Sequence, residues 1–212
     1  MLIGFKEITD ILLSNNITVF GSFHLGAHEC EELGFYTNLG LTPNDVLWID
    51  AMPSKVSEAQ HRGIPNVYNA VITDKDDEDV IFNVSNNFQS SSVFELGSHS
   101  REHPHITYVG KIEQKSITID TFFERNQIDA SKYNFWNFDI QGAELIALKG
   151  ATKSIQYAKA IYLEVNEKEL YINCGLIHEV DEFLSQYNFK RVLTTMTRHG
   201  WGDALYILDI AS

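Results

Sequence analysis

Residues 135–150 read Phe-Trp-Asn-Phe-Asp-Ile-Gln-Gly-Ala-Glu-Leu-Ile-Ala-Leu-Lys-Gly, and they decide the class of fold. The mostly apolar run 135–140 predicts a buried strand, and residues 144–149 predict a helix that ends at Gly150. Gly142 permits a sharp turn between the two elements. A strand that turns directly into a helix is half of a strand–helix–strand unit, so this stretch predicts a parallel sheet.

The alternation of strands and helices continues on both sides of this stretch. Further strands are predicted at 19–25, 46–50, 66–73, 80–84, 117–119, 160–165, 189–195 and 204–208. Further helices are predicted at 5–13, 54–62, 121–126 and 179–187. Asp120 is the expected N-cap of the helix 121–126. The carboxylate-rich stretch 28–32 suits the first turn of a further helix.

The end of the chain narrows the class. The last two predicted strands are separated only by a turn that contains Gly200 and Gly202, so they form an antiparallel hairpin. The fold is therefore expected to be α/β, a mostly parallel sheet with helices on both faces and a C-terminal antiparallel β-hairpin. A plain dinucleotide-binding fold does not require that hairpin.

Length and charge limit the partners. The 212 residues suit a single domain, 1–212, with an N-terminal helix inside residues 1–16. The 29 acidic and 16 basic residues give a net charge of −13, which disfavours nucleic acid and anionic membranes as partners. Cys30 and Cys174 are too few for a disulfide framework, and no apolar run is long enough to span a membrane. We expect a cytoplasmic protein with a small-molecule or glycan substrate; the oligomeric state stays open.

Residues 74–115 interrupt the alternating pattern and are expected to form an insertion on the substrate side of the sheet. Their polar segment contains Asn86 and Gln89, short hydrogen-bonding side chains that suit a sugar. The segment 99–105 is rich in histidine, but Pro104 interrupts any helix that would place its imidazoles on one face. No metal site is predicted, although a divalent metal is possible.

The first predicted strand ends in His-Leu-Gly-Ala-His-Glu-Cys, residues 24–30. Gly26 and Ala27 let the backbone approach a ligand closely, and a following helix offers free N–H groups. Asp50 ends the next predicted strand, 24 positions after Gly26, where a carboxylate can accept both hydroxyls of a ribose. Although the second and third glycines of G-x-G-x-x-G are absent, the two features together imply a nucleoside-bearing cofactor.

Asp139 follows the apolar run of the deciding stretch. A carboxylate in that place is partly desolvated, so its pKa rises unless it is paired. Glu144 lies in the first turn of the next helix, and Glu164 ends the following strand. Paired carboxylates hold a proton, a cation or a substrate hydroxyl. The alternative is that Asp139 only caps the helix.

The whole pattern resembles the FkbM family of S-adenosylmethionine-dependent methyltransferases. The segments that carry the resemblance are 24–29, 48–51, 139–144, 148–151, 162–166 and 202–206, in the expected order. Asp-Ile-Gln-Gly-Ala-Glu and the Leu-Lys-Gly-Ala that follows are the most specific. The resemblance implies a Rossmann-like class I methyltransferase fold that ends in the same hairpin, with S-adenosyl-L-methionine as cofactor. The chain departs from the family at His24, where Asp is usual, and at Cys30, where Gly is usual.

The resemblance also implies roles for single residues. The cofactor-binding residues it implies are Gly26, Ala27 and His28 at the methionine end, Asp50 and Ala51 near the ribose, Val71 near the adenine, and Asp139 at the methyl-transfer centre. Family members methylate hydroxyl groups, often of sugars, which implies an O-methyltransferase acting on a sugar or glycan. Asp139 is the first candidate base, with His103 and His199 as alternatives. The candidate substrate-binding residues are Asn86, Gln89, Glu144 and Trp201, whose ring suits stacking on a sugar.

Two other functions stay open. A nicotinamide-dependent oxidoreductase would use the same strand-to-helix turn, but the missing glycines and the terminal hairpin count against it. A catalytically silent methyltransferase-like binding domain is the second alternative, suggested by His24 and Cys30.

Overall fold

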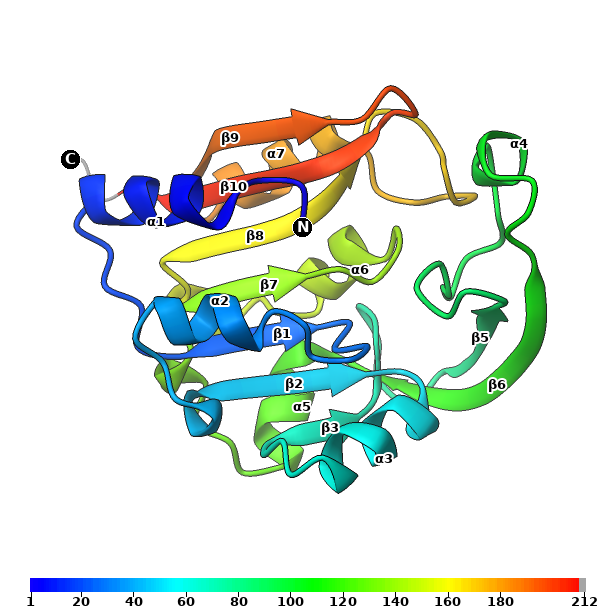
Figure 1. Ribbon diagram of the computed structural model, residues 1–212, viewed down its shortest axis with the longest axis horizontal. Helices are drawn as coiled ribbons and strands as arrows, with labels where there is room; N and C mark the ends of the chain where they lie inside the picture. The colour runs from blue at the N-terminus through cyan, green and yellow to red at the C-terminus, as the bar shows by residue number, and fades with distance from the viewer. Residues whose placement is uncertain (210–212) are drawn as a thin grey trace.

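The computed structural model describes residues 1–209, which form a seven-stranded sheet with helices on both faces (Figure 1). Its strands are β1 (Ser22–Leu25), β2 (Val46–Asp50), β3 (Val67–Asn69), β7 (Phe135–Phe138), β8 (Ala160–Asn166), β9 (Phe189–Met196) and β10 (Trp201–Leu208). Their order is β3-β2-β1-β7-β8-β10-β9. Neighbours from β3 to β8 are parallel, whereas β10 is antiparallel to both β8 and β9. The predicted mostly parallel sheet with a C-terminal antiparallel hairpin is confirmed.

The helices divide between the two faces of this sheet (Figure 1). One face carries α1 (Phe5–Ser14), α2 (Leu33–Asn38) and α3 (Pro53–His61), and the other carries α5 (Ile119–Arg125), α6 (Glu144–Lys149) and α7 (Ile177–Ser185). Short 3₁₀ helices are η1 (Pro43–Asp45), η2 (Ala130–Lys132) and η3 (Ser154–Tyr157). Within residues 1–209, no helix has the length and apolar character needed to cross a membrane.

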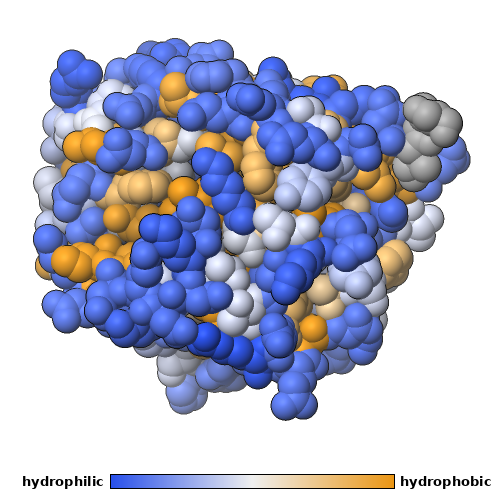
Figure 2. All heavy atoms as spheres, turned by 180° about the vertical axis from the view of Figure 1, so that it is seen from behind, coloured by the Kyte–Doolittle hydropathy of each residue, from blue (hydrophilic) through white to orange (hydrophobic). Residues whose placement is uncertain are grey.

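The sheet is buried on both faces because its strands are apolar at successive positions. In β2, Trp48 packs with the α1–α3 layer and Ile49 packs with the α5–α7 layer. Side chains alternate across a strand, so a strand buried on both faces reads as a continuous apolar run. Outside this core, hydrophilic side chains cover most of the face that carries α5–α7 (Figure 2).

A second, small sheet lies beyond the carboxyl ends of the main strands. It contains β4 (Val71–Ile72), β6 (Tyr108–Ile117) and β5 (Asp79–Ser85), in the order β4-β6-β5. Between β5 and β6, the chain forms the short helix α4 (His99–Glu102). The predicted strand 66–73 is thus wrong as one element, because its two halves, β3 and β4, join different sheets.

Three local predictions are wrong. The predicted strand 117–119 is only the end of the ten-residue β6, which is largely exposed and has no apolar run to reveal it. The carboxylate-rich stretch 28–32 does not form the first turn of a helix. His28 and Cys30 adopt the left-handed region at φ 40° and 58°, and α2 begins at Leu33. Thr118, rather than Asp120, caps α5 by accepting a hydrogen bond from the Thr121 N–H.

Candidate active site

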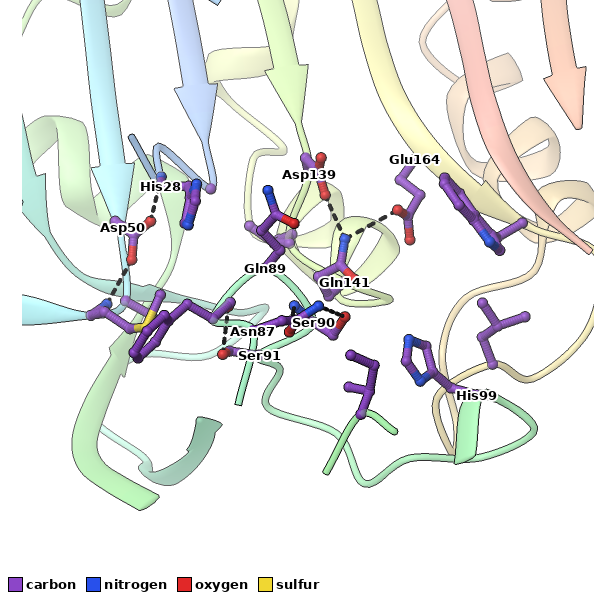
Figure 3. Close-up of a pocket in the computed structure, with 18 of the residues that line it drawn as sticks. His28, Asp50, Asn87, Gln89, Ser90, Ser91, His99, Asp139, Gln141 and Glu164 are labelled. Atoms are coloured by element: carbon purple, nitrogen blue, oxygen red, sulfur yellow. Dashed lines mark hydrogen bonds between the residues drawn. The ribbon is translucent and has the colours of Figure 1, made fainter. Parts of the chain in front are cut away.

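A cavity of about 550 Å³ opens where the carboxyl ends of the parallel strands meet (Figure 3). Parallel α/β sheets bind their ligands at this edge. Four residues line the cavity from four neighbouring strands: Gly26 and Asp139 follow β1 and β7, Asp50 ends β2, and Glu164 lies near the end of β8. The chain between β5 and β6 lines it from the opposite side. The volume lies within the range of small-molecule sites.

Gly26 lets two turns approach each other. Its φ is 87°, and a Cβ on it would lie 1.9 Å from the carbonyl oxygen of Asp139. Only glycine is compatible with both the dihedral angle and this contact. Ala27, its neighbour, is 1% exposed and packs in the core under the α1–α3 layer, so the structure places it behind the cavity wall. His28 lies at the wall.

Asp50 is held by two backbone N–H groups. Its Oδ2 accepts from His28 N at 2.7 Å, and its Oδ1 accepts from Met52 N at 2.7 Å (Figure 3). Burial raises the pKa of the Asp50 carboxyl, and the two N–H donors oppose that rise. A carboxylate has about four lone-pair sites, so each oxygen keeps one for a ligand hydroxyl.

A smaller cavity of about 30 Å³ adjoins the main one, and its lining is apolar. Val71 lies in its wall, and Ala51 and Phe82 line both cavities. The structure thus places Ala51, the neighbour of Asp50, in the same apolar wall as Val71. An apolar wall of this kind suits a flat heteroaromatic ring.

Gln141 bridges two carboxylates at the ends of β7 and β8 (Figure 3). Its Nε2 donates to Asp139 Oδ1 at 2.6 Å and to Glu164 Oε2 at 3.1 Å, and its Oε1 accepts from the Tyr171 hydroxyl at 2.6 Å. Asp139 is exposed to the cavity, but the surrounding protein displaces bulk water and raises its pKa, and the charge of Asp203 adds to this rise. Burial also raises the pKa of Glu164.

Within residues 1–209, Glu144 lies behind this cluster and does not line the cavity. Its side chain is 3% exposed, and Oε1 accepts from Ile140 N at 2.8 Å. Burial raises its pKa to about 8. Glu144 therefore stabilises the turn that presents Asp139 and Gln141. The alternative that Asp139 caps α6 has no hydrogen bond to support it within residues 1–209.

Some of the predicted substrate-side residues line the cavity from the chain between β5 and β6 and from the start of β10. Gln89, His103 and Trp201 line the cavity. Asn86 is exposed and holds its own loop, donating to His105 O at 2.8 Å and accepting from Thr107 N at 3.3 Å. Three of the predicted side chains thus lie around the same space as Asp139, and Asn86 lies outside it.

His199 lies behind His103, with ring centroids 5.0 Å apart. Its Nδ1 is 2.8 Å from Glu102 Oε2, and its Nε2 accepts from Arg198 Nε at 3.1 Å. Because both ring nitrogens have partners, neither is free to take a proton from a substrate. Within residues 1–209, no three His, Cys, Asp or Glu side chains are arranged to hold a metal ion.

The structure shows the surroundings of the two residues that depart from the family pattern. His24 is 1% exposed on the α1–α3 side of β1, where its Nδ1 is 2.7 Å from the Tyr36 hydroxyl and its ring packs on Trp48. Burial lowers the pKa of His24 to about 4, so the ring is neutral at pH 7. His24 also lies outside the cavity lining. Cys30 adopts φ 58°, a conformation that glycine adopts more readily.

Gln141 and Asp203 also line the cavity, and neither was predicted as a lining residue from the sequence. Asp203 pairs in register with Glu164 across β10 and β8, and its Oδ2 accepts from the Tyr162 hydroxyl and from Leu2 N. An acidic residue directly before the apolar run 204–208 was a usable signal for Asp203. Nothing comparable marked Gln141, because its role depends on Tyr171, which is 30 residues away.

The strand order and the antiparallel β10, together with the carboxylate that ends β2, define the class I S-adenosylmethionine-dependent methyltransferase fold. The chain belongs to the FkbM methyltransferase family, since the model of the methyltransferase FkbM domain matches residues 25–191. No curated protein matches the chain.

Solved structures are similar in fold. The CurJ carbon methyltransferase has a TM-score of 0.50 at 10% identity, over 96% of this chain and 52% of that chain. The magnesium protoporphyrin IX methyltransferase of Synechocystis PCC 6803 with bound SAM has a TM-score of 0.46 at 10% identity, over 97% and 78%. The O-methyltransferase from Bacillus cereus in complex with SAH has a TM-score of 0.43 at 10% identity, over 99% of this chain and 94% of that chain. At 10% sequence identity, similarity to a solved structure bears on the fold alone and not on the substrate.

Proposed function

We propose that this methyltransferase is an O-methyltransferase that acts on a hydroxyl of a sugar or glycan. The observation that carries the proposal is one cavity that joins a ribose-type carboxylate, Asp50, to a second carboxylate, Asp139. A polar wall faces both of them. The neutral or weakly charged acceptor is also in keeping with the net charge of −13.

The methyl donor is S-adenosylmethionine, and the residues present fit it. The Gly26 turn leaves no room for a Cβ, Asp50 has free lone pairs for two hydroxyls, and the apolar wall at Ala51 and Val71 suits adenine. His28 lies near the expected methionine end. When bound, the cofactor supplies an electrophilic methyl group on a sulfonium cation, which the acidic inner wall would stabilise.

Asp139 is the proposed base. Methyl transfer to a hydroxyl needs a group that removes its proton and a wall that orients the oxygen. Asp139 is exposed to the cavity, and its raised pKa makes its ionised form a stronger base than an ordinary carboxylate. His103, which lines the cavity, is the better of the two alternatives, because both nitrogens of His199 are engaged.

We propose that residues 74–115 cover the acceptor within a single domain. Gln89 and Trp201 would contact the acceptor, and Asn86 would fix the loop that carries Gln89. Glu144 would act only through the turn it stabilises. A cytoplasmic location stays a prediction, in keeping with Cys30 and Cys174 as free thiols.

The experiment is a transfer assay with S-adenosylmethionine labelled in its methyl group and a panel of methyl glycosides. We expect labelled product from the wild-type chain and at least about a hundredfold less from Asp139→Asn, with cofactor binding retained. Full turnover by Asp139→Asn would remove Asp139 from the chemistry. Cofactor binding without transfer to any glycoside would favour the silent binding domain, or another acceptor class, over this proposal.

A further inference from the structure

His99 belongs to the wall of the cavity that faces the carboxylates. It is the first residue of α4, and its backbone N–H donates to Leu170 O at 3.1 Å. The side chain is 6% exposed and lines the cavity. Figure 3 shows the ring directed towards the side that carries Gln141 and Glu164. In the sequence, this histidine is one of three in the His-rich segment 99–105.

The His99 ring has an unpaired nitrogen. Nδ1 is buried and has no hydrogen-bond partner within residues 1–209. The ring packs between His103 and Tyr171, with centroid distances of 4.9 and 5.4 Å. Buried N–H groups without an acceptor are rarer than buried lone pairs without a donor. We infer that Nδ1 carries the lone pair, so the proton of the neutral ring is on Nε2.

The ring is also held uncharged. Burial and the neighbouring His103 and His105 rings lower the pKa of His99 to about 4. The Tyr171 ring also packs on His99, and its hydroxyl is bonded to Gln141. His99 therefore offers an N–H donor whose protonation state is constant around neutral pH.

This donor complements the opposite wall. The proposed base Asp139, in its ionised form, only accepts hydrogen bonds, whereas a neutral imidazole with its proton on Nε2 donates one. A substrate hydroxyl offers both a proton to donate and oxygen lone pairs to accept a hydrogen bond. A polyhydroxylated molecule offers several such groups. A protonated amine has no lone pair to accept from His99. The two walls together thus favour a neutral polyol.

We propose that His99 is a further substrate-binding residue of this cavity, donating its Nε2–H to an oxygen of a neutral polyhydroxylated substrate such as a sugar. The inference rests on the proposed O-methyltransferase function. Tyr171 connects this subsite to the proposed base, since its ring contacts His99 and its hydroxyl bonds to Gln141, which holds Asp139.

Nitrogen-15 NMR of the histidine-labelled protein with S-adenosylhomocysteine bound tests the tautomer. We expect the His99 signal, assigned by its loss in His99→Gln, to show a neutral ring with the proton on Nε2 from about pH 6 to pH 8. Methyl glycosides are then titrated as probes. We expect them to shift the His99 Nε2–H signal and to leave the signal of exposed His178 unchanged. A proton on Nδ1, or no shift at His99 with any glycoside, would overturn the subsite.

Matched variants separate the hydrogen bond from packing. His99→Gln keeps an N–H donor near the Nε2 position, whereas His99→Phe keeps the ring and loses the donor. In the labelled transfer assay, we expect the KM for the glycoside to rise about tenfold in His99→Phe and to recover in His99→Gln, with unchanged affinity for S-adenosylhomocysteine. Equal KM values in the wild type and His99→Phe would contradict the proposal. Absence of S-adenosylhomocysteine binding would instead refute the methyltransferase function itself.

Discussion

The side-chain amide of Gln141 donates to Asp139 Oδ1 at 2.6 Å, and this contact restrains the carboxylate that we propose as the base. The same nitrogen reaches Glu164, so one amide restrains both acids. Gln141 itself adopts φ 56°, a conformation that few non-glycine residues adopt outside turns and functional sites. Gly142 follows at φ 95°, where a Cβ would lie 2.8 Å from Cys174 Cβ. The Asp-Ile-Gln-Gly turn is therefore built to present Asp139.

Gln141→Leu removes the amide without adding charge. The amide favours the ionised forms of Asp139 and Glu164, so its loss raises both pKa values further. A base must be ionised, and activity is lost as pH falls through its pKa. The acid limb of the pH–rate profile should therefore move to higher pH, with about tenfold lower turnover at neutral pH. Gln127→Leu is the matched control, because Gln127 is exposed and also adopts φ 56°. An unchanged acid limb in Gln141→Leu would count against a base held by Gln141.

Gly26→Ala should destabilise the fold severely. The new Cβ would meet the Asp139 carbonyl oxygen at 1.9 Å in a left-handed backbone conformation. We expect the free energy of unfolding in urea to fall by at least about 3 kcal/mol. Gly34→Ala in α2 is the control, because a Cβ there has no neighbour within 4 Å, and it should stabilise the protein by about 0.5 kcal/mol. Similar effects of the two substitutions would mean that the turns after β1 and β7 do not meet as described.

Glu144 makes stability depend on pH. Its pKa rises from its ordinary 4.5 to about 8 in the folded chain. Between these pH values the unfolded chain releases the proton and the folded chain retains it, so the free energy of unfolding falls as pH rises. Glu144→Gln still accepts from Ile140 N but does not titrate, so its stability should fall less steeply. Asp139 and Glu164 act in the same direction, so some slope remains. Urea denaturation at both ends of this pH range measures how the free energy of unfolding changes with pH. Equal slopes in the wild type and Glu144→Gln would show that Glu144 is ionised when folded.

Elements and strand-end residues were predicted correctly from the sequence where one local pattern decides the structure. Residues 144–149 were predicted as the helix that α6 forms, since the strand before it is apolar and Gly150 ends it. Asp50 and Gly26 were found because a strand end and a tight turn are local features. The long β6 was missed because it alternates exposed and half-buried positions outside the main core.

Roles that depend on distant partners could not be predicted. His199 was a candidate base by residue type alone, and only the structure shows Glu102 and Arg198 on its two nitrogens. In the sequence, His103 was named as an alternative base, whereas His99 was only one member of the His-rich segment. Burial and an unpaired Nδ1 distinguish His99. Such differences arise from packing between segments that are far apart in the chain.

A calorimetric titration with S-adenosylhomocysteine tests whether the cavity at the strand ends is a cofactor site. We expect one site per chain for the wild type and for Asp79→Asn, a control on the exposed part of β5, and no binding of NAD. Asp50→Asn should bind S-adenosylhomocysteine about 10- to 100-fold more weakly, because it loses the charged acceptor for two hydroxyls. Circular dichroism checks that this variant folds, since Asp50 also holds the His28 and Met52 N–H groups. Equal affinity in Asp50→Asn, or no binding to the folded wild type, would contradict a cofactor site built on Asp50.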